Sequence, residues 1–170
     1  MTEAQPGDFG LVSIEGGVGI LIRIGQWLNG DGFRNYEHAF VYLGDGKLIE
    51  AQPGGAQIDD LAKYAGREIA WSTGLVELSE AQRTGIVADA MKLVGTPYSF
   101  LDYLAIFLYR IHIRHPFVAQ RVIKSKHMIC SQLAATVWDN NGQQLTSFPP
   151  YLVTPGKMLK YLSSLSKKLV

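Results

Sequence analysis

The stretch that decides the fold is HAFVYLGDGKLIE, residues 38–50. Residues 38–43 are rich in β-branched and aromatic side chains, and residues 44–46 (Gly-Asp-Gly) are typical of a turn. Residues 47–51 then form a matching return strand, which the turn-forming residues 52–55 close. We therefore predict a β-hairpin at this point of the chain.

The register of this hairpin decides whether two of its polar side chains can meet. With a three-residue turn, Leu43 pairs with Lys47 and Gln52 lies opposite His38. Cross-strand partners point the same way and side chains alternate along a strand, so Glu50 then shares the face of His38 as a diagonal neighbour. A two-residue turn would shift the register by one residue and move Glu50 to the opposite face.

The single cysteine of the chain, Cys130, lies at the expected start of a helix. Apolar residues recur at helical spacing through residues 130–138, and residues 140–142 (Asn-Asn-Gly) end the pattern. A thiol at a helix N-terminus lies near the positive end of the macrodipole, which favours the nucleophilic thiolate. With His38 as base and Glu50 as its orienting partner, Cys130 would complete a thiol-based catalytic site. The alternative is a buried structural cysteine.

The remaining elements complete one α+β domain over residues 1–170, with an antiparallel sheet packed against helices. Ser79 and Gln82 form a capping box before one helix, and Thr154 with Pro155 starts the last one. We expect strands at 9–14 and 68–71, a rigid loop at 147–151, and helices at 18–28, 59–64, 80–94, 100–113, 130–139 and from 155 onward.

The composition excludes few classes of protein, but it indicates the partners and the compartment to expect. The chain has 170 residues, of which 47% are hydrophobic and 18% charged, and its net charge of +1 gives no argument for a nucleic-acid partner. A lone cysteine forms no internal disulfide. Residues 1–6 do not resemble a secretory signal, and the longest apolar stretches fall short of the roughly 20 residues that cross a bilayer. We expect a protein that is cytoplasmic as made.

Several segments taken together resemble the circularly permuted NlpC-like papain-fold proteins, which include the YiiX-like hydrolases and the relatives of lecithin:retinol acyltransferase. The resemblance rests on Pro-Gly-Asp at 6–8, the hairpin at 38–50, Gly-Thr-Pro-Tyr at 95–98 and Ile-Cys-Ser at 129–131. In the permuted group the histidine strand precedes the cysteine helix, as it does here. The resemblance covers roughly residues 6–140, and residues 103–128 form an insertion with no counterpart.

The resemblance implies a permuted papain-like fold and acyl-transfer chemistry without a cofactor or metal. Cys130 would be the nucleophile, His38 the base and Glu50 the third member of the site. The oxyanion would be held by the Cys130 backbone N–H and one further donor, for which the candidates are Gln52, Tyr98 and Tyr36. Peptidoglycan peptides rank first as substrate and lipid acyl groups second. Such an enzyme would be virion-associated or otherwise delivered to the cell envelope.

Two other interpretations use the basic part of the chain. A zinc site could draw on Cys130 and on three histidines, His112, His115 and His127. The first histidine pair falls in an expected helix and Pro116 follows it directly, which argues against zinc. Residues 103–138 contain five Lys or Arg and no Asp or Glu, so a non-catalytic module could contact an anionic membrane surface or polymer through residues 103–126.

Overall fold

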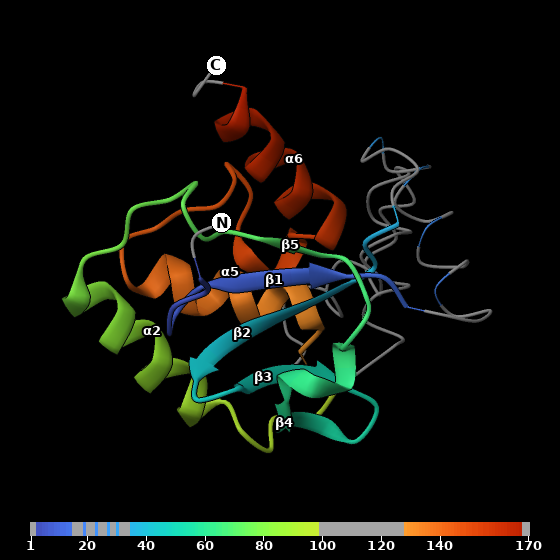
Figure 1. Cartoon of the computed structure of the whole chain (residues 1–170), viewed down its shortest axis with the longest axis vertical. Helices are drawn as coiled ribbons and strands as arrows, with labels where there is room; N and C mark the ends of the chain where they lie inside the picture. The colour runs from blue at the N-terminus through green and yellow to red at the C-terminus, as the bar shows by residue number, and fades with distance from the viewer. Residues whose placement is uncertain are drawn as a thin grey trace, which may run out of the picture.

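The computed structural model describes residues 3–14, 19, 23, 27, 30, 35–98 and 128–167. Its sheet has five antiparallel strands in the order β4-β3-β2-β1-β5, which confirms the α+β class with an antiparallel sheet (Figure 1). The strands are β1 (Phe9–Val12), β2 (His38–Gly44), β3 (Lys47–Gln52), β4 (Gly55–Asp60) and β5 (Ile69–Trp71). The helices are η1 (Leu61–Tyr64), α2 (Glu80–Lys92), α5 (Cys130–Asn140), η2 (Pro150–Leu152) and α6 (Pro155–Ser166).

The main core lies between one face of the sheet and the helices. Helix α5 runs behind β1 and β2 in Figure 1 and contacts β2, β3, α2 and η2. Alternate strand residues point at it because the side-chain period of a strand is two. The buried side chains that meet here come from β1, β2, β3 and α5: Phe9, Leu11, Ala39, Val41, Ile49, Ala51, Leu133, Ala134, Val137 and Trp138.

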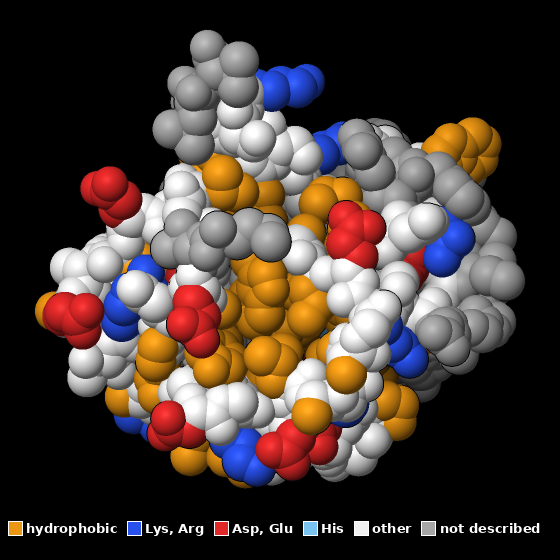
Figure 2. All heavy atoms as spheres, in the orientation of Figure 1, with side chains coloured by type: hydrophobic (Ala, Val, Ile, Leu, Met, Phe, Trp, Pro, Cys, Tyr) orange, Lys and Arg blue, Asp and Glu red, His pale blue; other side chains and the backbone are white. Residues whose placement is uncertain are grey.

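The opposite face of the sheet carries a second, smaller cluster. It consists of Val12, Phe40, Leu48 and Tyr64, with partly buried side chains from η1 and β5 around it. Figure 2 shows apolar side chains gathered in the middle of the face turned to the viewer, over β1 and β2, with charged side chains around them. The even-numbered residues of β2 point to this side, which is therefore the side of His38.

The β2–β3 hairpin reaches the expected register by a different turn. Gly44 pairs with Lys47, so the turn has two residues, Asp45 and Gly46, whose φ angles of 50° and 71° suit a type I′ turn. The predicted pairing of Leu43 with Lys47 is therefore wrong. A bulge at Leu43 adds one residue to β2 and restores the pairing of Val41 with Ile49. Beyond the bulge the strands have the register that brings Glu50 to the face of His38.

Other local predictions are confirmed where the signal is a cap or a turn. Ser79 and Gln82 form both hydrogen bonds of the capping box, and Thr154 caps α6 with Pro155 in its first turn. Helix α2 ends at Lys92 rather than at residue 94, and β1 ends at Val12 rather than at residue 14.

Two predictions of irregular or helical structure need correction. Residues 55–60 form strand β4, which was not expected, so the helix predicted at 59–64 shrinks to the 3₁₀ turn η1. Each residue of β4 pairs with β3 in a second hairpin across Pro53 and Gly54, and this pairing outweighs the weak local pattern of β4. The predicted loop at 147–151 contains the start of η2.

Some predictions fall on residues outside the description. The helix expected at 100–113 and the insertion at 103–128, apart from Met128, lie there. Of the helix expected at 18–28, only Gly19, Arg23 and Trp27 are described, and all three are helical. Within the described part of the chain, no helix is both long and apolar enough to cross a membrane.

Trp138 tests how much stability the α5–sheet packing supplies. Its side chain is fully buried, its indole Nε1 donates to the Gly7 carbonyl at 3.0 Å, and its ring meets Phe9 edge-on at 4.9 Å. We expect Trp138→Ala to lower the free energy of unfolding by about 3–5 kcal/mol, measured by urea denaturation. The control Trp27→Ala removes a side chain that is 58% exposed and should cost less than about 1 kcal/mol. Equal losses would contradict this packing.

Candidate active site

Cys130 lies at the first position of α5, next to the point where two strands part. Ile129 is the N-cap of this helix and provides no side-chain cap. The recorded β2–β3 pairs end at Val41 and Ile49, so Ala39 pairs with Leu11 of β1 but lies beyond the part of β2 that pairs with β3. The Cys130 sulfur accepts hydrogen bonds from the backbone N–H groups of Ala39 and Ser131. The strand and the helix therefore both direct backbone donors at the sulfur.

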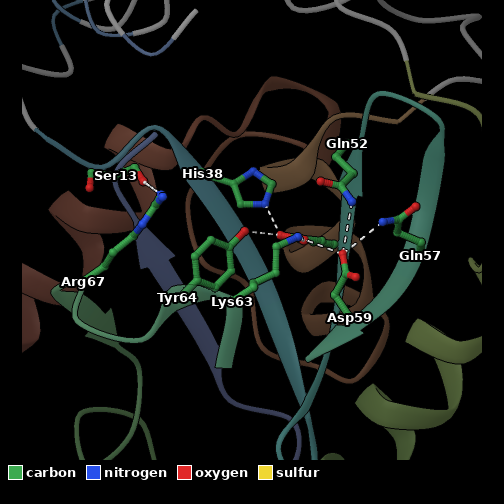
Figure 3. A network of polar contacts seen from close by, with 9 residues as sticks. Ser13, His38, Gln52, Gln57, Asp59, Lys63, Tyr64 and Arg67 are labelled. Atoms are coloured by element: carbon green, nitrogen blue, oxygen red, sulfur yellow. Dashed lines mark hydrogen bonds and ion pairs between the residues drawn. The ribbon is translucent and has the colours of Figure 1, made fainter. Parts of the chain in front are cut away.

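The structure brings His38 and Glu50 together with Cys130. The His38 Nε2 atom is hydrogen-bonded to Glu50 Oε2, and the His38 ring also hydrogen-bonds to Cys130. Because Nε2 faces the carboxylate, Nδ1 is the ring nitrogen left for the sulfur. All three side chains are buried: Cys130 is 5% exposed, His38 6%, and Glu50 has no access to solvent. In Figure 3 the His38 ring points at this carboxylate.

Electrostatics favours an ion pair between His38 and Cys130. Burial alone would lower the pKa of the His38 imidazole, but the charge and hydrogen bond of Cys130, followed by those of Glu50, raise that pKa to about 10. Burial would likewise raise the pKa of the Cys130 thiol, yet the adjacent His38 and the two backbone N–H groups hold it below its usual value. Both shifts favour an imidazolium–thiolate pair over the neutral pair.

Glu50 is ionised although it is buried, because it receives several donors. Burial would raise the pKa of this carboxyl, whereas His38, Lys63 and Tyr64 lower it to about 2. The Tyr64 hydroxyl donates to Oε2 at 2.5 Å, and the Lys63 ammonium donates to Oε1 (Figure 3). Burial and the Glu50 carboxylate together raise the pKa of Tyr64, which therefore stays a donor.

Lys63 and Tyr64 were missed by sequence reasoning. Both belong to η1, which follows directly on β4. Strand β4 runs antiparallel to β3 and ends beside Lys47, and from there η1 brings Lys63 and Tyr64 into contact with Glu50. The available signal was the Lys-Tyr pair itself, but without β4 nothing in the sequence placed it near the hairpin.

The three candidates for a second oxyanion donor lie in different surroundings. Burial and the charge of Cys130 raise the pKa of Tyr98. Its hydroxyl is therefore protonated, and it interacts electrostatically with the Cys130 sulfur. The Gln52 amide donates to Asp59 Oδ2 at 3.1 Å. Burial and a hydrogen bond with Glu68 raise the pKa of Tyr36 to about 12. Of these three side chains, Tyr98 is the one whose recorded interactions include the charge of Cys130.

Backbone pairing holds the segment of Tyr98 against the start of the cysteine helix. The Ala56 N–H donates to the Thr96 carbonyl at 2.8 Å, and the Met128 N–H donates to the Pro97 carbonyl at 2.8 Å. Tyr98 also forms a parallel bridge with Met128, two residues before Cys130. The Gly-Thr-Pro-Tyr segment is therefore hydrogen-bonded to β4 on one side and to Met128, just before α5, on the other.

The alternatives based on the basic segment concern residues outside the description. His112, His115 and His127 all lie there, as do residues 103–126. Within the described ranges, no three His, Cys, Asp or Glu side chains are grouped so that they could hold a metal ion. Cys130 itself is hydrogen-bonded to His38.

The ion pair makes the thiolate content of the protein depend on His38. We expect the ultraviolet absorbance of the Cys130 thiolate to be present at neutral pH and to disappear only on acidification, because the thiol pKa is depressed. In His38→Ala the thiol loses its cation but stays buried, so the signal should appear only at alkaline pH. Cys130→Ser supplies the tyrosine baseline. A wild-type signal that first rises near about pH 8.5, the ordinary thiol value, would contradict the ion pair.

No protein-family model matches the chain, and no curated protein matches it either.

Proposed function

We propose that this chain is a cysteine hydrolase that cleaves an amide bond through an acyl-enzyme, on a circularly permuted papain-like fold. The observation that supports the proposal most is the continuous line of contacts from Cys130 through His38 to Glu50. A nucleophile, a base within hydrogen-bond reach and an orienting carboxylate are the arrangement that acyl transfer requires. The order of the histidine strand before the cysteine helix fits the permuted family.

The first step would be attack of the Cys130 thiolate on the substrate carbonyl. A carbon–sulfur bond forms, and the carbonyl electrons move onto oxygen. When the tetrahedral intermediate collapses, the carbon–nitrogen bond breaks and the His38 imidazolium gives its proton to the leaving amine. The neutral imidazole then takes a proton from water, whose oxygen attacks the thioester carbonyl. When this second intermediate collapses, the carbon–sulfur bond breaks, the carboxylic acid leaves, and the imidazolium–thiolate pair is restored. Glu50 stays ionised and keeps the ring oriented throughout.

The oxyanion would lie at the start of α5. The Cys130 N–H belongs to the first helical turn, whose N–H groups have no acceptor inside the helix, and the macrodipole adds to its effect. Tyr98 is our choice for the second donor, because its protonated hydroxyl lies within electrostatic reach of the sulfur. Two donors of this kind stabilise the charge that develops in the transition state.

Peptidoglycan peptides are the proposed substrate class. The proposal follows the resemblance to NlpC-like enzymes, which most often cut such peptides. The acyltransferase relatives use lipid acyl groups, so lipid esters belong in the same assay. A thiol enzyme would form a thioester on Cys130 with either substrate. A panel that contains both therefore tests the thiol mechanism and the substrate preference separately.

Turnover should depend on the cysteine and on its base. We expect Cys130→Ala to reduce cleavage of muropeptides by at least about 10³-fold, and His38→Ala by about 10²–10⁴-fold, measured by mass spectrometry of the products. A thioester adduct on Cys130 should be detectable after rapid quenching. The matched control His112→Ala removes a histidine that the proposed site does not use, and it should retain wild-type turnover.

The same assay separates the rival explanations. Full activity in Cys130→Ala would contradict the thiol mechanism. Loss of activity in His112→Ala together with bound zinc would favour a metal site instead. Turnover of lipid esters but not of muropeptides would keep the mechanism and replace the substrate.

A further inference from the structure

Glu50 is held from two sides, and only one of them is the catalytic side. Its Oε2 atom faces His38 and Tyr64, whereas its Oε1 atom accepts from the Lys63 ammonium. Lys63 is held in turn by Asp59 at 2.8 Å. The Lys63 and Asp59 side chains are 33% and 27% exposed, whereas the Glu50 side chain is fully buried. The ammonium therefore lies between a buried carboxylate and solvent.

The charges along this line alternate in sign. In order they belong to Asp59, Lys63, Glu50, His38 and Cys130. The last three would together carry one net negative charge in the imidazolium–thiolate form, in a place with little access to solvent. An unbalanced buried charge is costly, and an adjacent cation offsets that cost. Among the described residues, Lys63 is the cationic side chain that contacts Glu50 in addition to His38.

We propose that Lys63 is a positioning residue of the active site: it orients the Glu50 carboxylate toward His38 and offsets the net negative charge of the group formed by Glu50, His38 and Cys130. The inference rests on the proposed function, since it concerns the same ion pair. Lys63 acts through Glu50 rather than on the substrate. The hydrogen bonds and charges of Asp59 and Glu50 raise the pKa of Lys63 against the effect of burial, so it is protonated throughout the neutral range.

The placement of Lys63 is fixed by neighbours on both sides. Tyr64, the next residue, stacks on Phe40 of β2 with ring centroids 5.5 Å apart, which holds η1 against the sheet. Asp59 also accepts from the amides of Gln52 and Gln57, at 3.1 and 3.0 Å. Among the described residues, the titratable groups recorded against Glu50 or the sulfur are His38 from β2, Lys63 and Tyr64 from η1, and Tyr98, while Asp59 from β4 contacts Lys63.

Removal of the Lys63 charge should raise the pH below which the Cys130 thiolate becomes protonated, which is the acid limb of its reactivity. Without the ammonium, Glu50 accepts a proton more readily, and a protonated Glu50 supports the imidazolium less well. The thiol then becomes harder to ionise, so the acid limb of thiolate reactivity should shift to higher pH, by about one pH unit.

The test is the pH profile of iodoacetamide labelling, because Cys130 is the single cysteine of the chain. Lys63→Met should shift the acid limb upward and slow labelling about tenfold at a pH below the wild-type limb. Lys63→Gln keeps a donor without the charge and should shift the limb in the same way, and it decides the test if the Met variant does not fold. Lys63→Arg should restore the wild-type profile.

The matched control is Lys47→Met. Lys47 pairs with Asp60 at 2.5 Å on the same strands, but both side chains are more than half exposed and neither contacts Glu50 in this structure. Its acid limb should stay at the wild-type pH. An unchanged acid limb in both Lys63→Met and Lys63→Gln, or an equal shift in Lys47→Met, would overturn the proposal.

The outcome is separate from the proposed activity. If the wild-type labelling profile has an acid limb that depends on His38, the ion pair exists whether or not a substrate is turned over. A shift in the Lys63 variants then supports the positioning role even if no muropeptide is cleaved. Loss of turnover in Lys63→Met without a shifted limb would point to a structural role and would contradict the inference.

Discussion

A carboxylate without access to solvent needs positive charges or hydrogen-bond donors around it. At Glu50 this requirement links the register of the sheet to the geometry of the candidate site. Glu50 accepts from a strand residue, His38, and from two residues of η1, Lys63 and Tyr64. A slip of one residue between β2 and β3 would turn the carboxylate to the face where Ile49 packs against the helices. Burial of an unpaired charge there would cost several kcal/mol, of order 3–5, so the register and the polar network stabilise one another.

The position of Cys130 follows from the same hairpin. Beyond Val41 and Ile49 the two strands have no recorded pairs, and the N-terminus of α5 lies beside this end of β2. The sulfur thus meets a backbone donor from the sheet, Ala39, and one from its own helix, Ser131. A strand and a helix start, each part of the main core, therefore place His38 and Cys130 relative to one another.

Sequence reasoning succeeded where signals are local and failed where an element depends on its partners. The hairpin, the start of α5 and the caps of α2 and α6 follow from alternation, turn residues and cap residues within a few positions. The register was right although the turn was wrong, because the bulge at Leu43 compensates for a two-residue turn. Strand β4 has little apolar alternation and exists through its pairing with β3, so Lys63 could not be placed beside Glu50.

The protonation of His38 tests the central claim most directly. Nitrogen-15 NMR of the four histidines, with His38 assigned by its loss in His38→Gln, reports whether one or both ring nitrogens carry a proton. At about pH 8, between the ordinary histidine pKa and the raised value of about 10, the account expects both nitrogens of His38 to be protonated. A neutral ring that titrates near its ordinary pKa would contradict the ion pair on which the site is built.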